Sequence, residues 1–102
     1  MKDADLYGGL VRLHILYHAS REPVFGLGIM EELARHGYKL SAGTLYPMLH
    51  SMEEAGYLRS TSRIVVGKMR RTYRITARGR KTLAAAKEKV TELFGELFED
   101  DS

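Results

Sequence analysis

The sequence contains no cysteine and no tryptophan, and only two of its 102 residues are proline. Without cysteine there is no disulfide and no thiolate metal centre. No apolar run is long enough to cross a membrane, and the first residues lack the apolar core of a signal peptide. We therefore expect a single small domain with a modest core, in a cytoplasmic protein that does not contact a membrane.

The motifs of known catalytic sites are missing as well. The sequence has no nucleophile elbow, no phosphate-binding loop and no recognised metal-ligand spacing. His14 and His18 stand one helical turn apart, but no carboxylate or cysteine lies at a matching helical spacing. We interpret these histidines as ordinary helix residues. The sequence predicts neither an enzyme nor a bound cofactor or metal.

Acidic residues are absent from one long window. Residues 55–87 carry ten Lys and Arg and no Asp or Glu, whereas residues 1–54 and 88–102 are net acidic. The overall formal charge is only +3, so the distribution is more informative than the total. An acid-free window of this length indicates a polyanionic partner, although a solvated basic face would have the same composition.

Residues 41–56 have the pattern of a helix with an unusual outer face. Apolar residues recur at helical spacing from Leu45 to Met52, and Ser41 is a favourable N-cap. The opposite face carries small, polar and aromatic side chains and no charge before residue 53, where a solvated face would carry Lys and Glu. Pro47 stands inside the helix, where it removes a backbone hydrogen bond. Since local rules are most often broken at functional sites, we predict that this face enters a groove of DNA.

The preceding segments complete a helix-turn-helix pattern. Helical spacing predicts a first helix from about Leu6 to Ala19, capped by Asp5, and a second helix over about Gly26–His36. A short connection containing glycine then leads into the helix over 41–56. That helix therefore takes the recognition position.

A β-hairpin is predicted after the recognition helix. Residues 57–66 and 71–76 have strand character, and residues 67–70 are predicted to form the turn, with cations that could reach phosphates. Helices and hairpin together predict a mainly α protein with a small β-hairpin. This is a winged helix-turn-helix domain over residues 1–76, followed by a long C-terminal dimerisation helix with an acidic tail over residues 77–102.

The final helix carries the pattern of an interface. Thr76 is expected to cap a helix that runs from Ala77 to about Phe98, with apolar residues spaced three and four apart over two heptads. Exposed phenylalanines near its end would be a liability on a monomer, so we expect a two-fold homodimer, helped by the first helix. The acidic residues 99–101 are expected to be solvated. The predicted dimerisation residues are Leu6, Leu10, Leu13, Leu83, Ala86, Val90, Leu93, Phe94, Leu97 and Phe98.

Three motifs resemble the PadR family of bacterial transcriptional regulators. They are Gly-Thr-Leu-Tyr-Pro at 43–47, Glu-Glu-Ala-Gly-Tyr-Leu at 53–58 and Tyr-Arg-Ile-Thr-Ala-Arg-Gly at 73–79, in register over most of residues 6–98. The resemblance implies a homodimeric winged-helix repressor of the family's short subgroup, bound to an inverted-repeat operator. It implies that Ser41, Thr44, Tyr46 and Pro47 face DNA and that residues 68–71 lie in the wing. The family's wing often contains a proline, which is absent here.

The predicted DNA contacts favour backbone and shape over base recognition. None of the side chains expected in the groove is Arg, Lys, Asn or Gln, the usual bidentate partners of bases. Wing cations are expected to supply much of the affinity, in a manner that falls steeply with salt. The predicted DNA-binding residues, on the helix 41–56, just before it and in the wing 66–72, are Lys39, Ser41, Thr44, Tyr46, Pro47, His50, Arg63, Lys68, Arg70 and Arg71.

Two alternatives stay open at this point. A small aromatic or hydrophobic effector could bind between the first and last helices, where Tyr7, Tyr17, Phe94 and Phe98 would line a cavity, but packing of the dimer explains these residues as well. The lack of tryptophan excludes a pocket built on paired tryptophans. A dimeric winged-helix module that binds proteins and not DNA is the second alternative, and the acid-free window argues against it.

Overall fold

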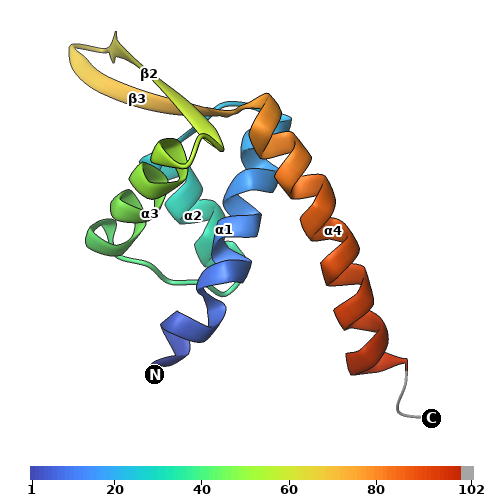
Figure 1. The fold of residues 1–102 in the computed structure, drawn as a ribbon. Coiled ribbons are helices and arrows are strands. Elements are labelled where there is room, and N and C mark those ends of the chain that lie inside the picture. Colours follow the sequence, from blue (N-terminus) through green and yellow to red (C-terminus); the bar gives the residue numbers. More distant parts are fainter. Residues whose placement is uncertain (100–102) are drawn as a thin grey trace.

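The computed structural model describes residues 1–99 and confirms a winged helix with one long terminal helix. Its body is built from the first three helices, the wing projects from one side, and the last helix crosses the first and extends away from the body (Figure 1). No helix among the described residues is long and apolar enough to cross a membrane. The elements are α1 (Asp3–Arg21), β1 (Val24–Phe25), α2 (Gly26–Arg35), α3 (Ala42–Glu54), β2 (Leu58–Val65), β3 (Lys68–Ile75) and α4 (Ala77–Phe98).

The core lies where α1, α2 and α3 meet the inner face of the sheet. Ile15 of α1, Leu33 of α2 and Leu49 of α3 are completely buried there. The apolar stripe predicted from Leu45 to Met52 is confirmed as the buried face of α3. Because burying each large apolar side chain contributes roughly 1.5–3 kcal/mol, this stripe fixes which face of α3 is left for solvent or a partner.

The first helix begins three residues earlier than the sequence predicted. Its first residue is Asp3, so Asp5 is not the cap but a residue of the first turn. The Asp5 carboxylate accepts a hydrogen bond from the backbone N–H of Lys2 at 3.0 Å. An acidic residue in this position satisfies an amide that the helix itself leaves free, which is why the helix extends past it toward the N-terminus.

The sheet has three antiparallel strands in the order β1-β3-β2, one more strand than the sequence predicted. The additional strand, β1, pairs Val24 with Tyr73 and Phe25 with Thr72. Two residues are too few to show the alternation by which strands are recognised in a sequence. Val24 and Phe25 form a strand because they pair with β3.

The hairpin turn also differs from the prediction. β2 and β3 are joined by Val66 and Gly67, whose φ angles of 52° and 74° are those of a two-residue hairpin loop. The predicted turn over 67–70 is wrong. Val66 was not expected in the turn, because a β-branched residue rarely adopts a positive φ. As a result Arg70 lies on a strand, and Lys68 is the cation nearest the tip.

The last helix starts inside the body and ends outside it. Thr76 caps it as predicted, since its Oγ1 accepts a hydrogen bond from the amide of Gly79 at 2.9 Å. Gly79 packs so closely on Tyr57 that an added Cβ would lie 2.3 Å from its carbonyl oxygen. Leu83 is only 8% exposed and packs in the core of its own chain, and its predicted part in the dimer stays a prediction. The domain boundary after Thr76 stays a prediction. Residues 100 and 101 of the predicted acidic tail lie outside the described residues.

Candidate nucleic-acid interface

The outer face of α3 is exposed and uncharged over its first three turns. Ser41 precedes the helix with an extended backbone, but its hydroxyl contacts the Thr44 hydroxyl at 3.3 Å and does not cap an amide. Thr44 and Pro47 are exposed, and with Gly43 they line a shallow groove between α3 and the start of α1. The amide of Thr44 donates to the Ser41 carbonyl at 3.1 Å, but the amides of Ala42 and Gly43 precede the first hydrogen-bonded turn of α3, which suits them to a phosphate.

Two of the predicted contacts on α3 are already engaged within the chain. The ring of Tyr46 lies against Gly26, where an added Cβ would come within 2.3 Å of the Tyr46 hydroxyl. Gly26 therefore makes room for the ring, and only the outer part of Tyr46 is available to DNA. His50 Nε2 lies 2.6 Å from Glu54 Oε1, so this imidazole is held by a carboxylate of its own helix. The DNA contacts of both residues stay predictions.

The register of the hairpin gathers most of its cations on one face. Arg59 lies opposite Arg74, and Arg63 lies opposite Arg70. Side chains directly opposite one another lie on the same face of the sheet. Lys68 lies on that face as well, because it precedes Arg70 by two residues on β3. Like charges opposite one another destabilise a hairpin unless an anion lies between them. The residues of this basic face are Arg59, Arg63, Lys68, Arg70 and Arg74.

Arg71 has a different environment from the basic face. Its guanidinium lies 2.9 Å from Glu53 Oε1 and donates a hydrogen bond to Ser60 Oγ at 3.0 Å. These contacts join the wing to the end of α3. Arg70, by contrast, lies over the ring of Phe25, with Cζ 4.2 Å from the ring centroid, and stays exposed. We therefore assign Arg71 first to fixing the wing, and its predicted contact with DNA remains to be tested.

Glu53 is the centre of this connection between α3 and the wing. Its Oε2 accepts hydrogen bonds from the hydroxyl of Ser60 at 2.5 Å and from the amide of Ser60 at 3.1 Å. The Ser60 hydroxyl is the largest cause that lowers the pKa of Glu53 below its ordinary value of 4.5, with further contributions from the Ser60 amide and Arg71. The ionised carboxylate thus sets the angle at which the wing leaves the body.

Glu53→Gln is expected to lower the free energy of unfolding by about 1 kcal/mol at pH 7, because a charged acceptor of several hydrogen bonds is lost. A lowered folded-state pKa stabilises the protein above pH 4.5, and this contribution disappears as the pH falls through the lowered value. Urea unfolding of both proteins at pH 7 and pH 3 measures the difference, which should shrink at pH 3. Glu54→Gln is the control, since Glu54 is exposed and pairs with the exposed His50 of its own helix. An equal loss in both variants would contradict the role of Glu53.

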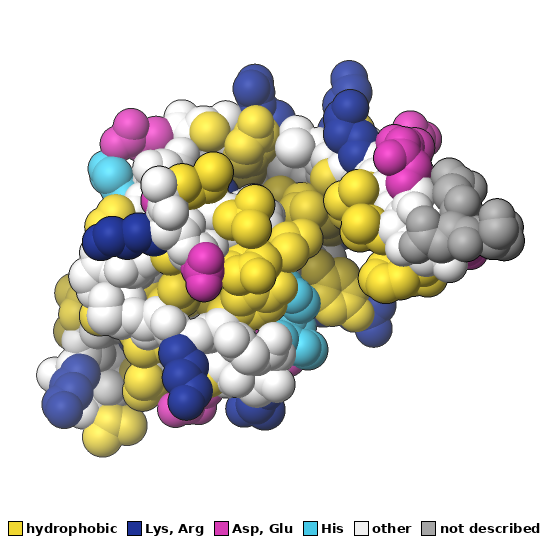
Figure 2. Space-filling view, turned by 90° about the horizontal axis from the view of Figure 1, so that it is seen from below, with side chains coloured by type: hydrophobic (Ala, Val, Ile, Leu, Met, Phe, Trp, Pro, Cys, Tyr) yellow, Lys and Arg dark blue, Asp and Glu magenta, His cyan; other side chains and the backbone are white. Residues whose placement is uncertain are grey.

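A second exposed surface lies along α1 and α4. Leu6, Leu93 and Phe98 are all at least half exposed, and apolar side chains surround a hollow between the body and α4 (Figure 2). The hollow has a volume of about 730 Å³. Of the four aromatic residues predicted to line a cavity, only Tyr17 lies along it. Of the predicted dimerisation residues, Leu6, Leu10, Val90, Leu93, Phe94, Leu97 and Phe98 are exposed, Leu13 and Ala86 are half-buried, and Leu83 is buried.

Comparison with known proteins identifies the family. Residues 15–85 match the model of the transcriptional regulator PadR-like family. The chain belongs to the PadR family. This PadR protein is 48% identical over 88 residues to transcriptional regulator Rv3488 of Mycobacterium tuberculosis, a match that covers 86% of this chain and 82% of that protein.

Solved structures agree with the family assignment. A PadR family transcriptional regulator from Eggerthella lenta superimposes with a TM-score of 0.79 at 30% identity, over 95% of this chain and 88% of that one. A PadR-like transcriptional regulator from Bacillus cereus gives a TM-score of 0.79 at 27% identity, over 95% and 99% of the two chains. This PadR protein is therefore a transcriptional regulator and not an enzyme, and it belongs to a family whose members bind DNA and are typically dimeric.

Sequence reasoning overlooked two cations of this PadR wing. Arg59 and Arg74 were not among the predicted DNA-binding residues, yet the register places them on the basic face. Strict alternation along β3 could have identified Arg74, because it puts Arg74 and Thr72 on one side. Identifying Arg59 required the register across the strands. Of the predicted contacts outside α3, Lys39, Arg63 and Lys68 are all exposed.

Proposed function

We propose that this PadR regulator binds an inverted-repeat operator in double-stranded DNA as a homodimer and represses transcription. The observation that carries the proposal is the basic face of the wing, of which Lys68 and Arg70 line one hollow with Tyr46 of α3, together with an outer face of α3 that is uncharged from Ser41 to Met52. Gly43 and Pro47 have small outward profiles, so the backbone of α3 can approach the floor of a groove. The wing cations then contact the adjacent phosphates.

The dimer follows from the apolar surface along α1 and α4. The exposed leucines and phenylalanines near the end of α4 are too many for a stable free monomer, and a two-fold axis covers both copies at once. Two recognition helices related by such an axis would contact half-sites about 34 Å apart, one turn of DNA. A dimer over a promoter represses by occlusion. This activity requires the compartment that holds the chromosome, in keeping with the predicted cytoplasmic location.

In-vitro selection with the purified full chain tests the proposal most directly. We expect a two-fold-symmetric site, because the two subunits present the same residues to each half of the DNA. The logarithm of the binding constant should fall with the logarithm of salt concentration, with a slope of about −0.9 for each phosphate neutralised. Weak retention on duplex DNA that does not depend on salt would contradict the proposal and favour the protein-binding module.

A further inference from the structure

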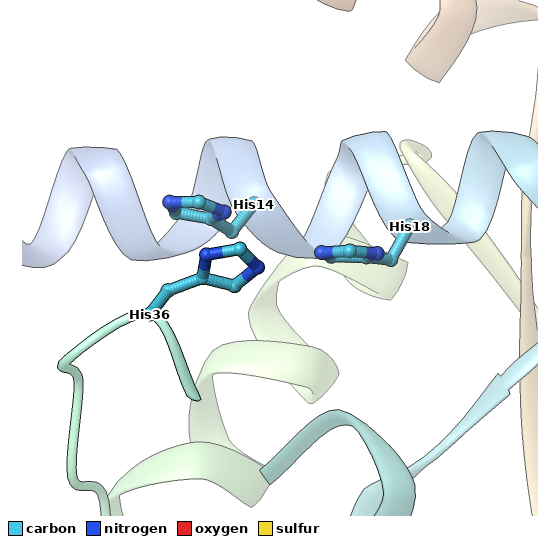
Figure 3. A group of neighbouring side chains, drawn as sticks. All are labelled: His14, His18 and His36. Atoms are coloured by element: carbon cyan, nitrogen blue, oxygen red, sulfur yellow. The ribbon is translucent and has the colours of Figure 1, made fainter. Parts of the chain in front are cut away.

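Three of the four histidines in the chain converge at one place outside the proposed DNA interface. His14 and His18 lie on consecutive turns of α1, and His36 directly follows α2. Their rings face one another (Figure 3), and one nitrogen of each lies within 4.8 Å of the others. The sequence pattern did not reveal this cluster, because the partner of His14 and His18 comes from another helix and not from the same helical face.

One buried nitrogen of the cluster makes no hydrogen bond within the part of the chain that the structure describes. It is Nε2 of His18. A buried polar atom left unsatisfied costs roughly 1–3 kcal/mol, and such an atom in a native structure is often explained by a bound ion or water. His36 lies between the other two rings (Figure 3), with its ring centroid 4.8 Å from that of His14 and 5.8 Å from that of His18.

The imidazole is a common ligand of transition metals. Burial, followed by the neighbouring His36 and His18, lowers the pKa of His14. A neutral imidazole is the form that binds metals. Three imidazoles this close also repel one another when protonated, and a single metal ion can bind all three in their neutral form.

A carboxylate stands at the edge of the three rings. Glu32 Oε1 lies 3.3 Å from His36 Nε2 and 3.6 Å from His18 Nε2. A hydrogen bond from Arg35 is the main cause that lowers the pKa of Glu32 below its ordinary value. Three imidazoles and one carboxylate form a nitrogen and oxygen donor set of the kind that zinc binds with four ligands. Metal–nitrogen bonds of about 2.0–2.1 Å require ligand atoms about 3.3 Å apart, so the rings would rotate inward by a small amount.

We propose that His14, His18 and His36, with Glu32, form a site for a divalent transition-metal ion, with zinc as the best fit, and that this ion is an effector of the regulator. The second part rests on the proposed function. The histidines and Glu32 line the hollow between α1 and α4, next to the surface that we assign to the dimer. His36 is also followed at once by the connection that leads into α3. An ion bound here draws the end of α2 toward α1 and so changes the position of the recognition helix relative to the dimer surface.

The alternative is that the rings serve only as packing. His14 also lies against Tyr38, with 5.3 Å between ring centroids, so the cluster has contacts that require no ion. The two roles differ in a measurable way. If the rings only pack against one another, replacing one of them changes the stability of the fold and nothing else. If they form a metal site, removing any one imidazole also weakens a saturable binding of metal ions.

Metal binding is tested on the full chain without an affinity tag and freed of metal. Titration with Zn²⁺ by calorimetry, and with Co²⁺ by visible absorption, should show one ion per chain and the intense bands of four-coordinate Co²⁺. His14→Gln and His36→Gln should each weaken binding more than tenfold, because each removes a ligand. His50→Gln is the matched control, since His50 is the one histidine outside the cluster, and it should bind as the wild type does. No saturable binding, or equal binding by the cluster variants, would overturn the site.

The effector role has a separate readout. The affinity for the selected operator is measured with and without Zn²⁺, for the wild type and for His36→Gln. Zn²⁺ should change the wild-type affinity at least about fivefold and leave His36→Gln unchanged. If Zn²⁺ binds and the operator affinity stays the same, the effector role is overturned while the site stands. If Zn²⁺ binds and no DNA is bound in either state, the proposed DNA-binding function is overturned.

Discussion

Replacing Arg63 and Arg70 together with glutamate is expected to reduce the affinity for operator DNA more than a hundredfold at low salt. The two residues face one another on the wing, so each dimer would lose four cations and gain four carboxylates near phosphates. The salt dependence should become shallower by about 0.9 for each phosphate contact that is lost. Fluorescence anisotropy with labelled operator across a salt series measures both effects.

The single variant Arg63→Glu separates binding from stability. It places a carboxylate opposite Arg70 and converts a repulsive pair into an attractive one, so the hairpin should gain up to about 1 kcal/mol while DNA binding weakens. Lys89→Glu makes the same change of charge at an exposed position of α4, which extends away from the body (Figure 1), and should leave the DNA affinity within about twofold of the wild type, since distant exposed charges are screened. Unchanged DNA binding by the double wing variant would remove the basic face from the interface.

Leu93→Asp is expected to convert the dimer into monomers. Leu93 is 50% exposed in the single chain, so the substitution disturbs little within the protomer. In the dimer, the exposed half of each leucine contributes about 1 kcal/mol on burial, and a carboxylate in the same place costs several kcal/mol more. Both terms occur twice about the two-fold axis. The dimer dissociation constant should therefore rise more than a hundredfold.

Light scattering over a range of concentrations checks the result for Leu93→Asp, and circular dichroism should show unchanged helix content. Leu27→Asp is the control, because Leu27 is an equally exposed leucine that lies on α2 beside the wing. It should remain dimeric. A persistent Leu93→Asp dimer would place the interface elsewhere, and a monomeric wild type would remove the inverted-repeat part of the proposed function.

Elements with long periodic patterns could be predicted from the sequence. The buried stripe of α3 and the course of α4 from its Thr76 cap follow from helical spacing and a single capping hydroxyl. β1 could not be predicted, because its two residues owe their conformation to a partner strand. The turn at Val66 was missed for a related reason, since its local preference for strand is overcome by the pairing on either side.

The candidate sites divide in the same way. The basic character of the wing is a matter of composition and was visible in the sequence. Which arginines lie on the basic face, and which one contacts Glu53, depends on the register between β2 and β3. The sequence of a single strand does not reveal this register. The histidine cluster depends on two helices meeting, and spacing rules within one helix do not describe such sites.

The short strand β1 divides the wing into two parts with different mechanics. It pairs with Tyr73 and Thr72, so the base of the hairpin belongs to a three-stranded sheet that is anchored in the body. Beyond Arg70 and Arg71, which still contact Phe25 and Glu53, β2 and β3 continue as a short two-stranded ribbon that ends at Val66, and an isolated ribbon of this kind is only marginally stable in water. We therefore expect the distal ribbon to open more often than the body. DNA would select its closed form, and part of the binding free energy would be spent on ordering it.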